Sequence, residues 1–204
     1  MPARIERLVT SGTFSLDGGT WDVDNNVWLV GDDTEVFVID PAHDPAAIAG
    51  AVGNRNVKAV LLTHGHDDHI RFAREFAALV DAPVLMNPAD QMLWETVFPG
   101  TSPDGPIGDD DTFEVAGTAL AALHTPGHSP GSTCFYAESL GAVFTGDTLF
   151  NGGPGATGQS FSDFPTIIAS ITERLLTLPP ETVVNTGHGD STTIGAEAPG
   201  ITAP

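Results

Sequence analysis

Four side chains that can bind a metal ion fall within residues 64–69 of this chain: His64, His66, Asp68 and His69. His64 and His66 are two positions apart, and such residues of an extended segment share a face. Asp68 and His69 are adjacent and must diverge as a helix begins. The segment can therefore serve two neighbouring metal ions. A solvated His-rich loop is the alternative, but three of only seven histidines in the chain lie here.

Three further segments offer metal ligands where predicted strands end. His128 lies in a turn rich in glycine and proline, Asp147 follows the strand at 142–146, and His188 follows the strand at 182–185. Imidazole and carboxylate groups suit zinc and related borderline metals. Each segment alone is a weak signal, but the four together predict a metal centre at one end of the strands.

The order and spacing of these segments resemble the metallo-β-lactamase superfamily over nearly the whole chain, and its HxHxDH element matches residues 64–69. The resemblance implies that His64, His66 and His128 bind a first metal. It implies that Asp68, His69 and His188 bind a second, with Asp147 bridging the pair. Two divalent cations are then expected, zinc by default, with iron or manganese also compatible with these ligands.

Within the superfamily the chain is most similar to the glyoxalase II-like thioester hydrolases. The similarity lies in residues 146–150 (GDTLF), the glycine pair at 152–153 and residues 187–195 (GHGDSTTIG). Residues 151–165 and the tail resemble small actinobacterial members that act on thioesters of mycothiol.

Three features depart from the glyoxalase II-like pattern. Ile70 and Arg71 stand where many members have two small residues, and Ala156 stands where many have an arginine. The helical C-terminal extension that binds glutathione in longer members is absent. These departures disfavour glutathione as the thiol carrier and leave the metal ligands unaffected.

We therefore predict a binuclear metal-dependent hydrolase whose partner is a small-molecule thioester. Paired cations activate water and polarise a carbonyl, and a thiolate needs little help from an acid to leave because its pKa is about 8.5. Asp147 and Asp68 are the expected catalytic carboxylates: Asp147 has two oxygens for bridging, and Asp68 can also move a proton. The alternatives are a persulfide dioxygenase with one iron, a lactonase or β-lactamase-like hydrolase, and a metal-binding scaffold without activity.

Composition narrows the other possibilities. The 204 residues carry a net charge of −20, which repels a phosphate backbone and argues against nucleic acid. The length predicts one hydrolase domain, residues 1–204. The only cysteine, Cys134, cannot form an internal disulfide and is expected to be a buried thiol. No apolar segment is long enough for a signal or a membrane span, so we expect a cytoplasmic protein.

Apolar spacing and turn residues predict mixed strands and helices. Strands are expected at 4–16, 19–23, 27–30, 36–39, 57–63, 83–86, 113–116, 118–123, 132–137, 142–146 and 182–185. Helices are expected from residue 45 and at 69–80, 88–97 and 163–178, with a loop at 99–111. The resemblance implies an α+β fold, the four-layer αββα sandwich of the metallo-β-lactamase type.

Several other polar residues have weaker functional interpretations. Asp40 ends a strand that points towards the expected metal centre. It either supports a metal ligand through a hydrogen bond or has no role in the site. His124 is expected to support the His128 turn rather than bind metal. His43 is expected on a surface loop, and Asp67 is expected to be solvated or to cap a helix.

Glycine-rich and aromatic residues near the Asp147 segment complete the candidates. The segment at 152–155 lacks the lysine of a phosphate loop and is expected to let the backbone pass close to the centre. Phe150, Phe161 and Phe164 are expected either at the mouth of the site or in the core.

Overall fold

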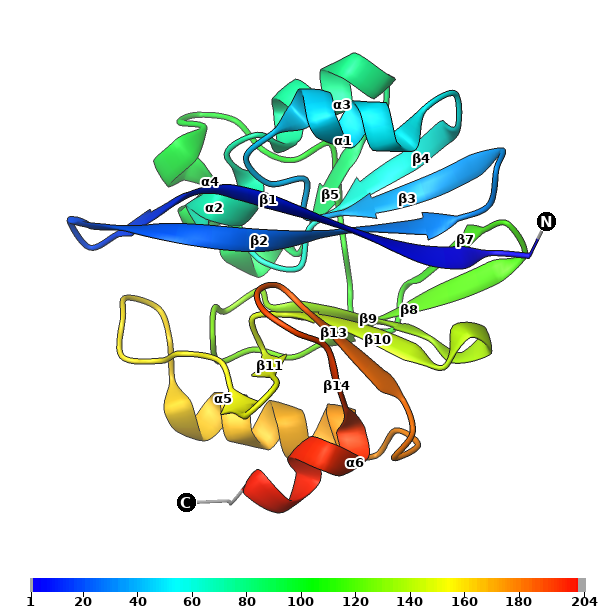
Figure 1. The fold of residues 1–204 in the computed structure, drawn as a ribbon. Helices are drawn as coiled ribbons and strands as arrows, with labels where there is room; N and C mark the ends of the chain where they lie inside the picture. The colour runs from blue at the N-terminus through cyan, green and yellow to red at the C-terminus, as the bar shows by residue number, and fades with distance from the viewer. Residues whose placement is uncertain (1, 202–204) are drawn as a thin grey trace.

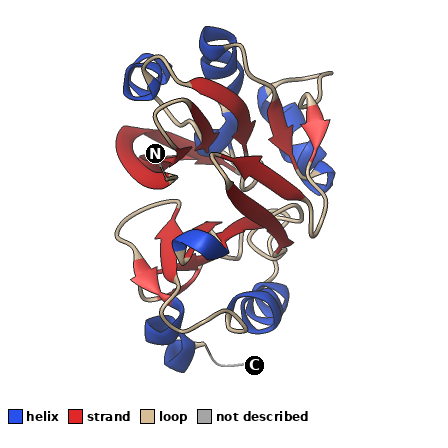
Figure 2. Cartoon of the chain, turned by 90° about the vertical axis from the view of Figure 1, so that its right-hand side faces the viewer, coloured by secondary structure: helices blue, strands red, loops and turns tan. Residues whose placement is uncertain are grey.

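Two six-stranded β-sheets pack face to face, with helices on their outer faces, in the computed structural model, which describes residues 2–201 (Figure 1). Met1 and residues 202–204, which the predicted domain also includes, lie outside the described residues. Seen from the side, the strands occupy the middle of the molecule and helices lie at its top and bottom (Figure 2). The predicted αββα architecture is confirmed.

The first sheet has the strand order β1-β2-β3-β4-β5-β6. Neighbours are antiparallel from β1 to β3 and parallel from β3 to β6. The strands are β1 Arg4–Leu16, β2 Gly19–Gly31, β3 Glu35–Ile39, β4 Asn56–Leu61, β5 Val84–Met86 and β6 Gly105–Pro106. Because β1 and β2 are 13 residues long each, their hairpin extends well beyond the rest of the sheet (Figure 1).

The second sheet has the order β14-β13-β10-β9-β8-β7. Its neighbours are antiparallel except β10 and β13, which run parallel. The strands are β7 Thr112–Val115, β8 Thr118–His124, β9 Thr133–Ala137, β10 Ala142–Gly146, β13 Val183–Thr186 and β14 Thr192–Thr193. A separate pair consists of β11 Leu149–Phe150 and β12 Gly153–Pro154.

Successive side chains of a strand point to opposite faces of its sheet. The apolar residues of the two sheets therefore form three separate cores. In β2, Trp28 and Val30 face the second sheet, and Trp28 meets Phe144 of β10 edge to face. Val27 and Leu29, on the opposite face of β2, pack under the helices of the first sheet. The third core lies between the second sheet and helix α5 (Phe164–Ser170) and contains Cys134, which is fully buried as predicted.

The helices begin and end at recognisable local signals. They are α1 Pro45–Val52, α2 Asp67–Ile70, α3 Ala73–Val80, α4 Gln91–Val97, α5 Phe164–Ser170 and α6 Ile194–Glu197, with single turns η1 Pro88–Asp90, η2 Glu138–Leu140 and η4 Ala198–Gly200, and a π-helical turn η3 Ile171–Leu175. Asp44 caps α1 and Asp163 caps α5, each accepting a hydrogen bond from a backbone N–H three residues on, with proline following in the first turn. No helix of residues 2–201 is long and apolar enough to cross a membrane.

Several predicted elements differ from the structure, among them the expected loop at 99–111, which contains the short strand β6. The expected helix at 69–80 is two helices, because α2 turns its first residues towards the strand ends while α3 packs Phe76 into the first core. The expected strands at 19–23 and 27–30 are one strand, β2. The polar residues between them, Asn25 and Asn26, do not break it because both side chains are buried and hydrogen bonded.

Candidate metal centre

The seven candidate ligands come together where strands of both sheets end. Residues 63–69 follow β4, Asp147 follows β10, His188 follows β13, and His128 lies in the β8–β9 loop. Parallel neighbours present their carboxyl ends at one sheet edge, and β10 and β13 are such a pair. The backbone N–H of Thr133 donates to the carbonyl of Thr63 at 2.8 Å, which brings the two sheet edges together.

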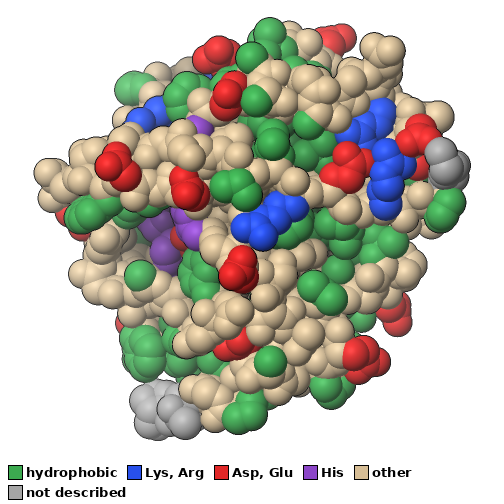
Figure 3. All heavy atoms as spheres, in the orientation of Figure 1, with side chains coloured by type: hydrophobic (Ala, Val, Ile, Leu, Met, Phe, Trp, Pro, Cys, Tyr) green, Lys and Arg blue, Asp and Glu red, His purple; other side chains and the backbone are tan. Residues whose placement is uncertain are grey.

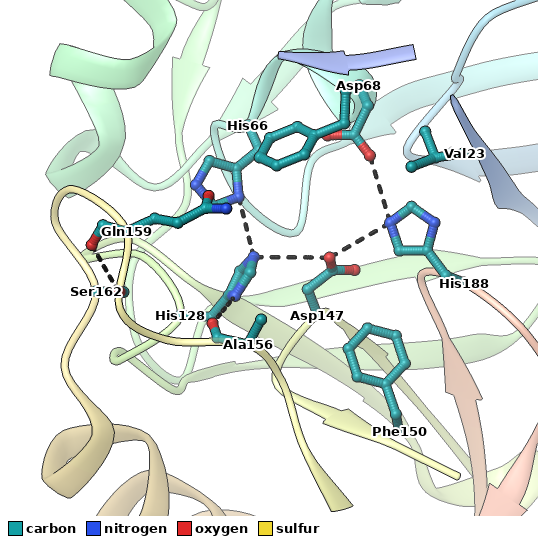
Figure 4. Close-up of a pocket in the computed structure, with 11 residues that line it drawn as sticks. Val23, His66, Asp68, His128, Asp147, Phe150, Ala156, Gln159, Ser162 and His188 are labelled. Atoms are coloured by element: carbon teal, nitrogen blue, oxygen red, sulfur yellow. Dashed lines mark hydrogen bonds and ion pairs between the residues drawn. The ribbon is translucent and has the colours of Figure 1, made fainter. Parts of the chain in front are cut away.

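Three histidines form the first group. His64, His66 and His128 each offer one ring nitrogen, and these three atoms lie within 4.8 Å of one another. His66 Nδ1 and His128 Nε2 are 2.9 Å apart. All three side chains are buried, and Figure 4 shows His66 and His128 facing the same space as Asp147.

Asp68, His69 and His188 form the second group. The Nε2 atoms of His69 and His188 lie 3.4 Å and 3.3 Å from Asp68 Oδ2. Asp147 lies between the groups: one of its oxygens is 3.6 Å from His128 Nε2 and 3.3 Å from His188 Nε2, and the other is 3.5 Å from His69 Nε2. Ligands about 2.1 Å from a tetrahedral metal lie about 3.4 Å apart, so the spacing fits two cations that share Asp147.

Unpaired polar atoms at this place also fit a bound cation. Within residues 2–201, His64 Nε2, His66 Nε2 and Asp147 Oδ1 are buried without a hydrogen-bond partner. A buried polar atom left in this way costs about 1–3 kcal/mol. Cations at the centre would satisfy His64 Nε2 and Asp147 Oδ1, whereas His66 offers its other ring nitrogen, Nδ1, which lies 2.9 Å from His128 Nε2.

The electrostatics differ between the two groups. Burial, helped by His128, lowers the pKa of His66 to about 3, so this imidazole is neutral, as a metal ligand must be. Burial also lowers the pKa of His188, but Asp147 and Asp68 outweigh it and raise that pKa to about 11. Without metal the second group is thus an imidazolium–carboxylate cluster, and divalent cations would replace its protons.

Asp40 and Asn25 hold the ligands of the second group from behind. Asp40 Oδ2 accepts from Thr63 Oγ1 at 2.6 Å and lies 2.9 Å from His69 Nδ1. Its other oxygen accepts from the Thr63 N–H. Asp40 is close enough to His64 and His69 to be counted as a ligand, but these three bonds already use its oxygens, so the supporting role is the better interpretation.

Sequence analysis missed Asn25 and misjudged His43 and Asp67. The Asn25 amide donates to Asp68 Oδ2 at 2.9 Å, and its oxygen lies 2.7 Å from His43 Nε2. His43 is therefore half-buried and is linked through Asn25 to the candidate ligand Asp68. Asp67 is buried, accepts from the Ser15 N–H and pairs with Arg71, so it ties β1 to α2 rather than facing water. The available signal for Asn25 was its place between the two predicted strands at 19–23 and 27–30.

A cavity of about 230 Å³ opens above the centre. Figure 3 shows histidine side chains reaching the surface in a hollow between the two halves of the molecule. Phe14, Val23 and Phe150 form its apolar walls, and Gln159 lies near the rim (Figure 4). The tip of the β1–β2 hairpin is tied to the loop at 155–162 across the mouth, since Asp17 accepts two hydrogen bonds from Ser160.

The remaining candidates take structural positions. His124 Nε2 lies 2.9 Å from the Pro130 carbonyl and so braces the loop that carries His128. Phe150 lines the cavity, whereas Phe161 and Phe164 are exposed outside it. The backbone at Gly155 passes directly against the Asp147 carbonyl, where a side chain would not fit.

Residues 20–188 match the family model of the metallo-beta-lactamase superfamily. The chain belongs to this superfamily. A probable metallo-hydrolase of Bacillus subtilis, YqgX, is 33% identical over 187 residues, covering 85% of this chain and 88% of its own. The hydroxyacylglutathione hydrolase GloC of Haemophilus influenzae is 32% identical over 188 residues, covering 84% and 89%.

Solved structures that superpose on this chain agree with the family assignment. A di-iron-bound form of TTHA1623 superposes with a TM-score of 0.75 at 31% identity over 93% of this chain and 96% of its own. The BLEG-1 B3 metallo-beta-lactamase gives 0.77 at 27% over 96% and 98%. ETHE1 from Myxococcus xanthus gives 0.71 at 26% over 84% and 75%. The superfamily and the His/Asp clusters together imply bound divalent metal.

We expect purified protein to bind about two transition-metal ions per chain, because each group supplies three ligands and Asp147 reaches both. Mass spectrometry of metal content, before and after reconstitution of the chelated protein with zinc or iron, measures this. A protein that never holds more than one ion after reconstitution would contradict the two-cation arrangement.

Gly187→Ala is expected to weaken metal binding about 10–100-fold, the effect of displacing a ligand's support. A methyl group here would press on Asp147 Oδ1 and lie 3.0 Å from a His69 ring carbon, so Asp147 must shift. The backbone at Gly187 accepts an L-residue, so the fold should persist. Gly50→Ala, which places its methyl in open space, is the control for calorimetric metal titrations. Equal affinities for both variants would show that Asp147 is not confined by Gly187.

Proposed function

We propose that the protein is a binuclear metal-dependent hydrolase that cleaves thioesters of a low-molecular-weight thiol. The observation that carries this proposal is the pair of three-ligand groups joined by Asp147 at the floor of the cavity. The relatives named a probable metallo-hydrolase and a hydroxyacylglutathione hydrolase support the same class of reaction.

In this proposal His64, His66 and His128 hold one cation, and Asp68, His69 and His188 hold the other. When bound, the cations, zinc or iron, would supply an activated water molecule and an electrophile for the thioester carbonyl. Phe14, Val23 and Phe150 would pack against the acyl group and keep bulk water from it. The departing thiolate is stable enough to need no strong acid.

Asp68 is better suited to ligation than to proton storage. Burial raises the pKa of this carboxyl, but His69 and the hydrogen bonds from His188 and Asn25 bring it down to about 2. Asp68 is therefore a carboxylate at neutral pH. The bond from Asn25 holds Oδ2 towards His188 rather than leaving it free to rotate towards substrate.

The cavity favours a thiol carrier without negative charge. Among the described residues that line it there is no lysine or arginine. The nearest candidates are engaged elsewhere: Arg71 pairs with Asp67 and donates to Thr13, and Arg7 donates to Asn26 and the Gly189 carbonyl. Glutathione carries two carboxylates that favour cationic partners, and the net charge of −20 repels it at long range.

We therefore expect a higher kcat/KM for acyl thioesters of mycothiol, S-formylmycothiol among them, than for S-lactoylglutathione. Mycothiol is an uncharged pseudo-disaccharide conjugate that would bind through hydroxyl groups. Side-by-side turnover of both thioesters by metal-loaded protein at low ionic strength measures the preference. Equal or faster hydrolysis of S-lactoylglutathione would rule out the carrier argument, and no turnover of any thioester in a panel of acyl groups would rule out the proposed reaction.

Assays with other substrates separate the alternative reactions. A persulfide dioxygenase would consume oxygen with a persulfide substrate and need one iron, and a lactonase or β-lactamase would hydrolyse those rings faster than thioesters. The complete second group, with Asp68, His69 and His188 within 4.8 Å of one another, favours two cations and hence the hydrolase.

A further inference from the structure

Asp90 is a fully buried carboxylate that touches the metal centre only through backbone and a hydroxyl. It ends η1, after β5 of the first sheet, and its side chain has no exposed surface. Asp90 Oδ2 accepts from the Gly65 N–H at 2.7 Å and from Ser129 Oγ at 2.6 Å. Asp90 Oδ1 accepts from the Gly131 N–H at 2.6 Å. It belongs to none of the groups that could hold a metal ion in the described part of the chain.

These three donors lie beside the ligands of the first group. Gly65 stands between His64 and His66, and Ser129 follows His128 directly. One carboxylate thus joins the loop after β4 to the β8–β9 loop, which belong to different sheets. The backbone packs tightly against Asp90, because a side chain at Gly65 or Gly131 would come within about 3 Å of Asp90 atoms.

We propose that Asp90 is a positioning residue for the first metal: it sets the distance between the pair His64 and His66 and the third histidine, His128. In the described part of the chain, the other backbone link between these two segments is the hydrogen bond from the Thr133 N–H to the Thr63 carbonyl. Buried hydrogen bonds to an ionised or strongly polar acceptor are short and directional, and supporting residues of this kind alter metal affinity about 10–100-fold.

The second group has supports of its own. His69 is held by Asp40, Asp68 by Asn25, and His188 by the Asp24 carbonyl, which lies 2.8 Å from His188 Nδ1. None of these contacts involves Asp90. The loss of the Asp90 carboxylate should therefore affect the two metals unequally, which a general loss of stability would not do.

The variant that isolates this role is Asp90→Asn. An amide has one acceptor oxygen, so if it accepts from Gly131 its NH₂ group faces the N–H of Gly65, and two donors oppose each other. The matched control is Asp32→Asn. The Asp32 carboxylate also accepts from two backbone N–H groups and one hydroxyl, those of Thr34 and Glu35, but it lies at the opposite end of β3 from Asp40.

The measurement is a zinc titration of each metal-free full-length protein by calorimetry, with ring ¹⁵N NMR of the histidines to assign each binding step. We expect Asp90→Asn to weaken the step that shifts His64, His66 and His128 about 10–100-fold. The step that shifts His69 and His188 should stay within about twofold, and Asp32→Asn should change neither.

Equal weakening of both steps by Asp90→Asn, or the same selective loss in Asp32→Asn, would overturn the proposal. If Asp90→Asn does not fold, Ser129→Ala removes one of the three hydrogen bonds and should weaken the first-group step alone, by a smaller factor; an unchanged step would also overturn it. The inference rests on the proposed metal centre but not on thioester turnover, because zinc affinity is read without substrate.

Discussion

Asp147→Ala is expected to lower kcat/KM for a thioester by about 1,000-fold or more and to reduce the metal content from about two ions per chain to one or none. Asp147 lies within 3.6 Å of the first group, at His128, and of the second, at His69 and His188. Removing its carboxylate also takes away the negative charge that offsets two cations. The fold should persist, because Asp147 sits in a turn after β10 rather than in a core.

Metal analysis and thioester turnover of the same preparations test this expectation. His124→Ala is the comparison, since His124 braces the His128 loop through the Pro130 carbonyl and contacts no candidate ligand atom. His124→Ala should lower kcat/KM for the thioester by about 10–100-fold. An Asp147→Ala protein with two metals and near-normal turnover would show that the bridging assignment is wrong.

Asp40→Ala should lower the free energy of unfolding by about 3–5 kcal/mol, the usual effect of breaking a buried charged contact. The substitution strips acceptors from the Thr63 N–H, the Thr63 hydroxyl and His69 Nδ1 at once. Asp40 also has a φ of 49°, where alanine is strained and asparagine is tolerated. Chemical denaturation of the metal-free protein measures the loss.

Asp40→Asn distinguishes the effect of losing the carboxylate from the effect of backbone strain at this position. Asparagine suits the left-handed conformation and can still accept from Thr63, so stability should stay within about 1–2 kcal/mol of the parent. Its NH₂ group, however, would donate to His69 Nδ1 and leave the proton on Nε2, the atom that faces Asp68 and Asp147. Metal affinity should then fall about 10–100-fold. Asparagine and alanine variants of equal stability would contradict the separate roles.

Local patterns were enough to predict the candidate ligands and a mixture of strands and helices, and the αββα arrangement followed from the family resemblance. Apolar runs at 27–30 and 36–39 predicted strands, which pair antiparallel as parts of β2 and β3, and the HxHxDH segment at 64–69 placed four metal-capable side chains at the end of another strand. Those signals are local because side-chain period and strand ends are set by neighbours along the chain. They also placed Asp147 and His188 after strands, and the structure shows that these strands, β10 and β13, are parallel neighbours whose carboxyl ends meet.

The supports of the centre could not be predicted in this way. Asn25 and Asp90 lie 43 and 25 residues from the groups they bind, Asp68 and Gly65. Nothing in the sequence near either residue marks a partner so distant, and polar residues inside an apolar strand or after one are more often loop residues. The same reason led to the wrong surface assignment of His43.

The sequence by itself determined which chemical groups are present: imidazoles and carboxylates at strand ends, in an order typical of one superfamily, on a chain with a net charge of −20. What only the tertiary structure decided is which of these groups meet, what holds them and what surrounds the cavity. Those distances arise when two sheets pack through Trp28 and Phe144 and bring strands that are distant in sequence to within hydrogen-bond range, as with Asn26 of β2 and Thr186 of β13, which are 160 residues apart. Burial then gives each polar group a partner or leaves it directed at a cation, because an unpaired group in the interior is costly.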